Sequence, residues 1–276
     1  MPKPGFAYGC LRVLLPLTGA VAAIHVLHAA TLDRVVQYTE VPFRSRNVPA
    51  ALDGYRIAFV CDAHGISERT LNDAVARLNS GPIDLLLLGG DFHHDPQRAA
   101  LSLEILSGVR ASDGIFGVEG NHDDRAYLFP AMKARGITPL LNEGARIRDG
   151  LFLAGTADMK SVGPGPCIAS AVENAEPGDF VLLLTHNADL TMRRPTAGID
   201  LVLSGHTHGG HVTLFGLWAP ALTLSRAVTH YRQRFMSGWA KSRDGVPVFV
   251  SRGIGGYFPR VFARPQVVIV TLRSES

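Results

Sequence analysis

The chain has 276 residues, enough for one large domain or two small ones with a sizeable core. Its 46% hydrophobic and 18% charged content describes a globular protein with an apolar addition, and its three cysteines are too few for a disulfide framework. The net charge of +3 is modest, and the sequence has no glycine-rich nucleotide loop, coiled-coil heptad or nucleic-acid motif. We therefore expect no nucleic-acid partner.

The amino-terminal segment, residues 1–36, carries the apolar addition. Val13 to Leu32 have no charged side chain, and a run of about 20 residues is the length that a helix needs to cross a bilayer. Pro16, His25 and His28 weaken the pattern. A cleaved secretory signal is the alternative, and a buried soluble helix would rarely lack a polar face over this length. We predict an uncleaved anchor helix followed by a single domain over residues 37–276.

Residues 37–53 are polar and contain Pro42 and Pro49, which indicates a connector with one edge strand. The next segment, Tyr55–Cys61, is typical of a buried strand and leads into Asp62 and His64. Alternation along an extended chain puts these two side chains on one side, where both can reach one metal ion.

A helix is predicted after Ser67, which has the character of an N-cap, because apolar residues follow at helical spacing. The run Asp84–Leu88 is typical of a strand buried on both faces, and it ends at Asp91. A carboxylate in that position is costly unless it is paired or bound to a metal. A second helical pattern spans Arg98–Val109.

Three further strands deliver residues of the same kinds. Gly114–Val118 leads to Asn121, His122 and Asp123, although an Asn-rich turn with a solvated histidine would explain this segment on its own. A hairpin is predicted over Ala145–Asp158 around Asp149-Gly150.

The last two strands are Asp179–Leu184, which delivers His186, and Asp200–Leu203, which delivers His206 and His208. Neutral imidazole is the commonest protein ligand for metals. Each of these signals is weak alone, and a His-rich loop can be plain surface. Five strand ends with ligand-type residues together indicate a metal site.

The order Asp-x-His, Gly-Asp, Gly-Asn-His-Asp, Thr-His and Gly-His-Thr-His resembles the calcineurin-like metallophosphoesterase superfamily over roughly residues 50–272. The Gly-His-Thr-His-Gly-Gly tail, the polar stretch before Tyr55 and the segment Val250–Gly255 resemble one bacterial branch of it. That branch includes membrane-associated phosphodiesterases and the UDP-2,3-diacylglucosamine pyrophosphatase of the lipid A pathway. The resemblance implies an α/β fold, a four-layer α/β/β/α sandwich, with the site at the carboxyl ends of the central strands.

The resemblance also implies the roles of the site residues. Two divalent metal ions are expected, and mixed nitrogen and oxygen ligands without thiolate suit Mn, Fe or Zn. The first ion would be held by Asp62, His64 and His208, with Asp91 bridging to the second, whose other ligands would be Asn121, His186 and His206. His122 would protonate the leaving oxygen or stabilise charge on the transferred group, and Asp123 would orient His122.

The function expected from this resemblance is hydrolysis of a phosphodiester or pyrophosphate bond by metal-activated water, in an anionic substrate that is lipid-linked or amphiphilic, such as a UDP-diacylglucosamine. A catalytically silent scaffold and a phosphodiesterase acting on a small soluble ester are the alternatives. The branch pattern departs at His211, where Gln is usual, and no role is assigned to His93 or His94.

We further predict attachment to the bacterial inner membrane, on a side left open. Between Ser225 and Pro265 there are many basic and aromatic residues and one acidic residue, Asp244, a composition that favours a membrane surface. The basic and aromatic residues in or beside this region are Arg226, Arg232, Arg234, Lys241, Arg243, Arg252, Arg260, Arg264, Trp218, Trp239, Tyr231, Phe235, Tyr257, Phe258 and Phe262.

Overall fold

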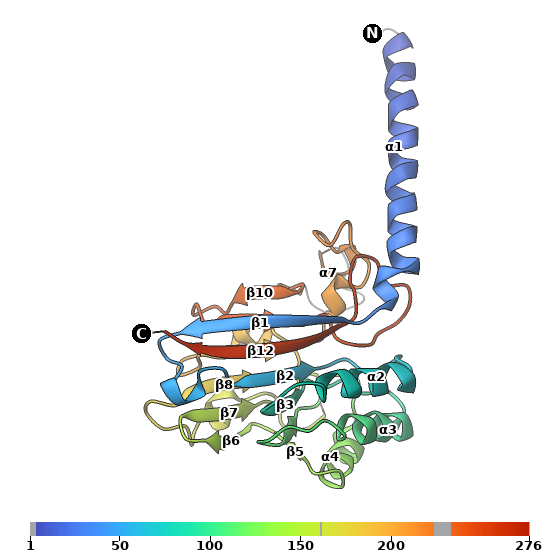
Figure 1. The fold of residues 1–276 in the computed structure, drawn as a ribbon. Coiled ribbons are helices and arrows are strands. Elements are labelled where there is room, and N and C mark those ends of the chain that lie inside the picture. Colours follow the sequence, from blue (N-terminus) through green and yellow to red (C-terminus); the bar gives the residue numbers. More distant parts are fainter. Residues whose placement is uncertain (1–3, 161, 224–232, 276) are drawn as a thin grey trace.

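Two six-stranded β-sheets face each other in the fold (Figure 1). The computed structural model describes residues 4–160, 162–223 and 233–275; of residues 4–15 and 223 it describes the backbone alone. The first sheet has the order β1-β12-β2-β3-β4-β5, and the second has the order β10-β11-β9-β8-β7-β6. The mixed α/β class with two sheets, predicted from the sequence, is confirmed.

The strands have these bounds: β1 Gln37–Ser45, β2 Arg56–Val60, β3 Leu85–Leu88, β4 Ile115–Gly117, β5 Ile137–Pro139, β6 Glu143–Arg148, β7 Leu151–Gly155, β8 Phe180–Leu184, β9 Leu201–Ser204, β10 Gly238–Lys241, β11 Pro247–Val250 and β12 Gln266–Ser274. The α-helices are α1 Pro4–Ala30, α2 Glu68–Leu78, α3 Pro96–Leu106, α4 Arg125–Lys133, α5 Ile168–Ala171, α6 Leu190–Arg193 and α7 Pro220–Thr223. Short 3₁₀ turns are η1 Leu32–Arg34, η2 Ala50–Leu52 and η3 His208–Gly210.

Parallel pairing in the middle of both sheets brings several strand ends to one edge. Strands β2, β3, β4 and β5 pair in parallel in the first sheet, and β7, β8, β9 and β11 do so in the second. The hairpin predicted around Asp149-Gly150 is present as the antiparallel pair β6–β7. Because the loops that leave parallel strands lie at one edge, the residues that follow these strands can meet.

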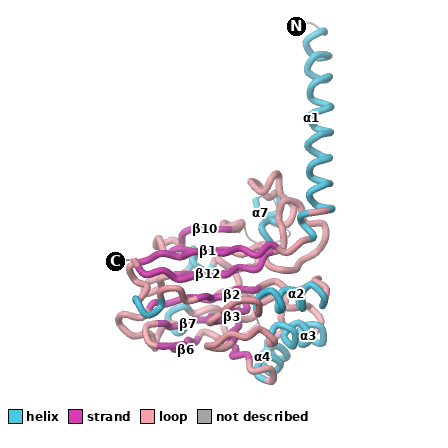
Figure 2. Tube along the Cα trace, in the orientation of Figure 1, coloured by secondary structure: helices cyan, strands magenta, loops and turns pink. Residues whose placement is uncertain are grey.

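The core between the sheets is apolar and closed. Phe59 and Leu87 of the first sheet belong to one buried cluster with Leu153, Leu182 and Phe249 of the second. Helices α2, α3 and α4 cover the outer face of the first sheet with a second cluster, and the short helices α5 and α6 contribute to a third on the second sheet. Figure 2 shows that loops, rather than helix or strand, connect most of these elements at the two ends of the sandwich. This core gives the loops a rigid base.

Local capping explains where the helices begin. Ser67, predicted as an N-cap, accepts a hydrogen bond from the Thr70 backbone N–H at 3.2 Å. Asp95 caps α3 in the same way, with Pro96 in its first turn, where the missing N–H costs nothing. The helices therefore start directly after the strand-end loops, and the caps fix how those loops leave the sheet.

The amino-terminal helix α1 extends away from the sheets (Figure 1). In the part of the chain that the structure describes, no helix combines the length and the apolar character needed to cross a membrane. The predicted inner-membrane anchor is therefore wrong on this finding.

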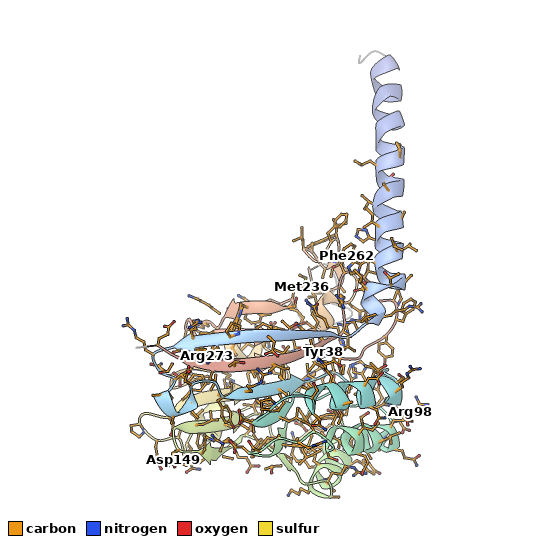
Figure 3. The ribbon with its side chains drawn as sticks, viewed as in Figure 1. Tyr38, Arg98, Asp149, Met236, Phe262 and Arg273 are labelled. Atoms are coloured by element: carbon orange, nitrogen blue, oxygen red, sulfur yellow. The ribbon has the colours of Figure 1, made fainter. Side chains whose placement is uncertain are left out.

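Polar contacts of the final turns of α1 give a physical reason for this correction. His28 Nδ1 lies 2.7 Å from Asp33 Oδ2, and its ring stacks on Phe262 at a centroid distance of 3.9 Å. The His25 ring meets Phe215 and Phe262 edge-on, and Figure 3 labels Phe262 beside the base of the helix. These imidazoles, which weaken the apolar pattern, pack against the domain.

The basic and aromatic region between Ser225 and Pro265 does not form a single exposed face. Arg260 is buried, and Arg252 bonds to the Gln37 side chain and to the Arg264 carbonyl. Phe235 is also buried. Arg226, Tyr231 and Arg232 lie outside the described residues. Several members that the sequence assigned to a membrane surface are therefore internal parts of the fold.

Candidate metal centre

Two clusters of potential metal ligands lie where the parallel strands end. The first group consists of Asp62, His64 and His208, and the second group consists of Asp91, His186 and His206. Within each group the ligand atoms lie within 4.8 Å of one another.

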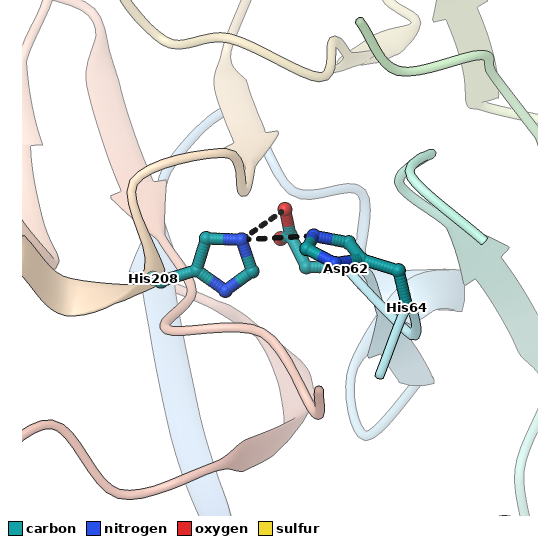
Figure 4. A group of neighbouring side chains, drawn as sticks. All are labelled: Asp62, His64 and His208. Atoms are coloured by element: carbon teal, nitrogen blue, oxygen red, sulfur yellow. Dashed lines mark hydrogen bonds and ion pairs between the residues drawn. The ribbon is translucent and has the colours of Figure 1, made fainter. Parts of the chain in front are cut away.

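In the first group the imidazole nitrogens converge on a buried carboxylate (Figure 4). His64 Nε2 and His208 Nε2 are 3.1 Å apart, and His208 Nε2 is 3.6 Å from Asp62 Oδ1. Asp62 and His64 follow β2, whereas His208 follows β9, so the two sheets contribute jointly. Three atoms with lone pairs thus face one point.

The second group combines a carboxylate and two imidazoles, and the Asn121 amide adjoins it. His186 Nε2 is 3.3 Å from Asp91 Oδ2, 3.2 Å from Asn121 Oδ1 and 3.2 Å from His206 Nδ1. The other ring nitrogen of His186, Nδ1, donates to the Gly89 carbonyl at 2.7 Å. That hydrogen bond fixes the tautomer that leaves Nε2 free to bind a metal. Six of the seven residues predicted as ligands therefore form the two groups, and the seventh, Asn121, lies beside the second group.

Four of the eight non-glycine residues with positive φ in the described part of the chain belong to the two groups. Asp62, Asp91, His206 and His208 have φ values of 55°, 57°, 74° and 49°, the left-handed region that non-glycine residues rarely adopt. Each such residue costs about 1–3 kcal/mol and persists only where its surroundings impose it. Strain of this kind clusters at functional sites, because turning the chain back at a strand end aims its side chain into the cleft.

Close backbone approach gives a second sign of a tightly built site. A Cβ placed on Gly120 would collide with the Asp91 carboxylate, and one on Gly256 would lie 2.7 Å from His208 Nδ1. Gly256 belongs to the loop after β11. It directly follows the segment Val250–Gly255, which resembles the bacterial branch of the superfamily. Glycine is therefore required at both positions for the ligands to keep their places.

Burial keeps three of the four ligand imidazoles neutral. Burial lowers the pKa of His64 to about 4 and that of His206 to about 3, and it lowers the pKa of His208 well below its usual value. Because the neutral ring is the form that binds a metal, these histidines are ready to act as ligands at neutral pH.

His186 and Asp91 behave as a pair. Burial opposes the charge on each, but their mutual attraction raises the pKa of His186 well above its usual value and holds the pKa of Asp91 well below. Burial raises the pKa of Asp62 to about 6, against the favourable charge of His186. Two buried carboxylates therefore share one nearby positive charge, a deficit that divalent cations would remove.

The predicted acid–base residues lie beside the two groups. The His122 backbone N–H donates to Asp91 Oδ1 at 2.8 Å, and its ring lies 5.7 Å from the His64 ring between centroids. Burial lowers the pKa of His122 despite the opposing charge of Asp91. The residue as a whole is nevertheless exposed, and it lies beside both groups.

Asp123 has contacts other than the one expected. Its carboxylate accepts hydrogen bonds from the backbone N–H groups of Asp91, Phe92 and Gly120, at 2.7, 2.9 and 2.9 Å. Among the described residues, none of its hydrogen bonds reaches the His122 ring. Asp123 thus positions the loop that carries Asp91. Its contacts do not include the predicted one that would orient the His122 ring.

Comparison with known proteins identifies the family. The profile of the calcineurin-like phosphoesterase family matches residues 55–210, more than half of the chain and the stretch that contains both groups. The chain belongs to the calcineurin-like phosphoesterase family.

Relatives of this family member include the uncharacterized metallophosphoesterase YkuE of Bacillus subtilis (strain 168), at 26% identity over 87% of this chain and 86% of the relative. The uncharacterized metallophosphoesterase Cj0846 of Campylobacter jejuni is 23% identical over 96% of this chain and 71% of the relative. A Danio rerio protein named as a transmembrane protein with metallophosphoesterase domain is 26% identical, over 94% of this chain and 62% of its own length. The phosphopantetheinyl hydrolase of Mycobacterium tuberculosis aligns with a TM-score of 0.44 at 14% identity, over 75% and 91% of the two chains.

The donor set of this calcineurin-like phosphoesterase fits a pair of divalent cations. Asp62 and Asp91 supply carboxylate oxygen, Asn121 supplies amide oxygen, and the imidazoles supply nitrogen. His64 Nε2 and His208 Nε2 face each other with both Nδ1 atoms buried and without hydrogen-bond partners among the described residues. The two Nε2 atoms lie 3.1 Å apart, and both rings could offer these atoms to one cation, so the donor set is consistent with the dinuclear centre of the family.

Sequence reasoning missed several residues that support the centre. Gln233 Nε2 lies 2.9 Å from His206 Nε2, and Arg260 Nη2 donates to the His208 carbonyl at 3.1 Å. Glu119 accepts from Arg125 and from the Asp158 backbone N–H, and Asp158 is 2% exposed with Oδ2 unpartnered among the described residues. Gln233 and Arg260 lie in loops outside the motifs, and the sequence assigned Arg260 to a membrane surface.

The three histidines without an assigned role occupy different places. His94 Nε2 lies 2.7 Å from the Tyr257 hydroxyl, and its ring meets the His122 ring at 4.2 Å between centroids. His93 Nδ1 accepts from the Asp95 backbone N–H. His211 meets the His208 ring edge-on at 5.9 Å. Of the three, His94 is the one whose ring contacts the ring of His122.

Proposed function

We propose that this protein is a dinuclear metal-dependent phosphoesterase that hydrolyses a phosphodiester or pyrophosphate bond. The observation that carries the proposal is the pair of ligand groups, joined by the hydrogen bond from the His206 N–H to the Asp62 carboxylate. Adjacent groups of this kind suit a reaction in which an attacking and a leaving oxygen are both stabilised.

The ligand roles are those expected from the sequence. Asp62, His64 and His208 would hold one cation, and Asn121, His186 and His206 the other, with Asp91 between them. Bound there, the cations would lower the pKa of a water and neutralise phosphoryl oxygens. The chain's own contribution is to keep three imidazoles neutral by burial and to hold the strained ligand backbones in place.

His122 is proposed as the group that donates a proton or hydrogen bond to the leaving oxygen. Its backbone is fixed to Asp91, and its ring is exposed beside His64. A donor at the mouth of the site can reach an ester oxygen that points away from the ligand groups. His94, in contact with His122 and with Tyr257, lies where the leaving group would pass.

The substrate is proposed to be amphiphilic. A groove of about 510 Å³ adjoins the first group, since Gly65 and Gly256 line it and the Gly256 N–H bonds to the His64 carbonyl. Ile66 and Phe258 give the groove apolar walls, and the Arg34 guanidinium lies 4.6 Å from the Phe258 ring centre. An ester with an apolar portion and a second negative charge suits this lining, and a lipid-linked pyrophosphate such as UDP-diacylglucosamine is one compound of that class.

Two alternatives remain distinct from this proposal. A phosphodiesterase of small soluble esters would use the same ligand groups but gain nothing from the groove. A silent scaffold would need neither the strained ligand backbones nor an exposed His122 at the mouth, so these features favour the enzyme.

The test is hydrolysis by purified full-length protein with Mn²⁺. Aryl phosphomonoester, aryl phosphodiester, UDP-diacylglucosamine and UDP-glucose would be compared by kcat/KM. We expect turnover of diester or pyrophosphate, with the acylated compound preferred over UDP-glucose. Preference for the soluble compounds would overturn the amphiphilic substrate alone, whereas metal binding without any turnover would support the scaffold.

A further inference from the structure

The His206 ring has one nitrogen, Nε2, that points away from the second group. In the described part of the chain, Gln233 is the one residue whose side chain bonds to it. His206 Nδ1 faces that group, 3.2 Å from His186 Nε2. The opposite nitrogen, His206 Nε2, lies 2.9 Å from the Gln233 side-chain nitrogen. The two sides of this ring therefore have separate partners.

The segment that carries Gln233 is fixed against both His206 and α6. The Arg234 backbone N–H donates to Asp189 Oδ1 at 3.0 Å. The Thr207 hydroxyl, next to His206 in the chain, donates to the Met236 carbonyl at 2.6 Å. Gln233 itself is 7% exposed, so its amide has little freedom to leave the imidazole. The contacts of Arg234 and Met236 and the burial of Gln233 thus hold its amide beside the His206 ring.

The amide presents one group to His206 and buries the other. As placed, its NH₂ donates to His206 Nε2, and its Oε1 is buried without a hydrogen-bond partner among the described residues. A neutral imidazole has one N–H and one lone pair, so this arrangement puts the proton on Nδ1, the nitrogen that faces the ligand group. Rotation of the amide by a half turn exchanges oxygen and nitrogen in the same space.

After that rotation the carbonyl oxygen accepts a proton from His206 Nε2–H, and the Nδ1 lone pair faces the cation site. Ligand histidines commonly have their other ring N–H bonded to an oxygen, which fixes both tautomer and ring angle. His186 has such a partner in the Gly89 carbonyl. The corresponding atom of His206 is Nε2. Among the described residues, the Gln233 side chain is its only hydrogen-bond partner.

We infer that Gln233 is a positioning residue for the metal centre: its side-chain oxygen selects the His206 tautomer in which Nδ1 binds the cation of the second group. The inference rests on the proposed dinuclear centre. It assigns to Gln233 a role through His206 and no contact with substrate. Loss of the oxygen therefore weakens the binding of one cation and leaves the other almost unchanged.

The experiment measures bound Mn²⁺ per chain against free Mn²⁺ for the full-length protein and two variants. Gln233→Leu keeps the bulk of the side chain and removes the acceptor, whereas Gln233→Glu keeps an oxygen at the same place. We expect the Leu variant to lose about 10–100-fold in affinity for one of two ions, as is usual for removal of a partner of a ligand histidine. The Glu variant should bind both ions with affinities close to those of the parent.

A double-mutant cycle shows whether the effect passes through His206. In a His206→Ala background the change Gln233→Leu should have no further effect on Mn²⁺ binding, because the ring that it orients is gone. Thermal unfolding of each variant without metal controls for a general loss of structure. Equal Mn²⁺ binding by the parent and the Leu variant would overturn the inference, as would equal losses in the Leu and Glu variants.

The readout separates this inference from the proposed activity. If the parent binds two ions with the expected dependence on Gln233 but cleaves none of the esters, the proposed function fails and the role of Gln233 stands. If the parent hydrolyses esters and the Leu variant binds Mn²⁺ like the parent, the activity stands and the role of Gln233 is excluded.

Discussion

The backbone N–H of His206 donates to both oxygens of the Asp62 carboxylate, at 3.2 Å from Oδ1 and 3.1 Å from Oδ2. Asp62 belongs to the first ligand group and follows β2, while His206 belongs to the second and follows β9. The hydrogen bond therefore joins the two groups and, through them, the two sheets. A disturbance of either strand end is expected to affect both metal positions.

Asp91→Ala should abolish the dinuclear centre. Asp91 Oδ2 faces His186, and Oδ1 accepts from the His122 N–H, so the change removes a ligand and releases the acid–base loop. We expect at most one tightly bound ion per chain and a fall in turnover of at least the roughly 10²–10⁴-fold that loss of one catalytic group costs. Metal analysis by mass spectrometry beside activity is the measurement.

The matched control is Asp95→Ala, which removes an exposed N-cap from α3. It should lower stability by about 0.5–2 kcal/mol and leave the metal content at two ions. Full metal content together with near-normal activity in Asp91→Ala would refute the role of Asp91 as a shared ligand.

His122→Ala should slow hydrolysis while metal content stays near that of the parent. The side chain is exposed at the mouth of the site, and its ring makes no hydrogen bond to a ligand residue among the described contacts. A proton donor contributes about 10²–10⁴-fold, most for a poor leaving group and least for an activated aryl oxide. A series of aryl diesters of graded leaving-group pKa measures this. Equal losses along the series would argue for charge stabilisation in place of proton donation.

The sequence predicted the strand-end loops well, because each is a local pattern. Buried aliphatic runs such as Leu85–Leu88 are followed by a glycine and a residue of metal-ligand type. The cap at Ser67 is recognisable because apolar residues follow it at helical spacing. The position of β12 could not be predicted in this way. It pairs in parallel with β1 and antiparallel with β2, and such pairing over more than 200 residues leaves no mark in a local window.

The site shows the same division. The seven residues predicted as ligands lie in short motifs, and six of them form the two groups with Asn121 beside the second. Gln233 and Arg260 reach the site from loops outside those motifs. The apolar stretch of α1 was interpreted by hydropathy alone. The contacts of His25 and His28 with Phe215, Phe262 and Asp33 depend on the folded domain, so no reading of that stretch by itself could have supplied them.

Asp33→Ala should loosen the contact between the end of α1 and the loop before β12. The buried Asp33 carboxylate accepts from the backbone N–H groups of Phe262 and Ala263, at 2.8 and 3.0 Å, and lies 2.7 Å from His28 Nδ1. Two N–H groups would lose their acceptor, so we expect a loss of about 1–3 kcal/mol in the free energy of unfolding.

Urea unfolding of metal-free protein measures this loss, and limited proteolysis should show faster cleavage near Phe262. Asp53→Ala is the control, because the exposed Asp53 carboxylate pairs with Arg273 at 3.3 Å and accepts only one backbone N–H, from Ser274 at 3.0 Å, among the described residues. Exposed pairs contribute about 0–1 kcal/mol. Equal effects of the two substitutions would mean that Asp33 does not hold α1 to the loop.

The last prediction concerns a polar clamp between the two sheets, formed by Tyr55, Asp113 and Arg148. The Tyr55 hydroxyl donates to Asp113 Oδ2 at 2.6 Å, and Arg148, at the end of β6 in the second sheet, donates to Asp113 Oδ1 at 2.8 Å. Burial opposes the charge on Asp113, but the bonds from Arg148 and Tyr55 outweigh it and hold its pKa below the usual value.

A carboxyl group whose pKa is depressed by folding stabilises the fold above its unfolded pKa, which is about 3.9, and loses that contribution as the pH falls through the folded pKa. We therefore expect Arg148→Leu to lower the free energy of unfolding by about 0.5–1 kcal/mol at pH 7, and the difference from the parent to shrink below about pH 4. In an Asp113→Asn background the same change should have a smaller effect that does not vary with pH. Urea unfolding from pH 3 to pH 7 tests this. A difference that stays constant over that range would show that Arg148 acts through its contact with the Tyr55 ring, 4.8 Å from the ring centre, and not through the Asp113 carboxylate.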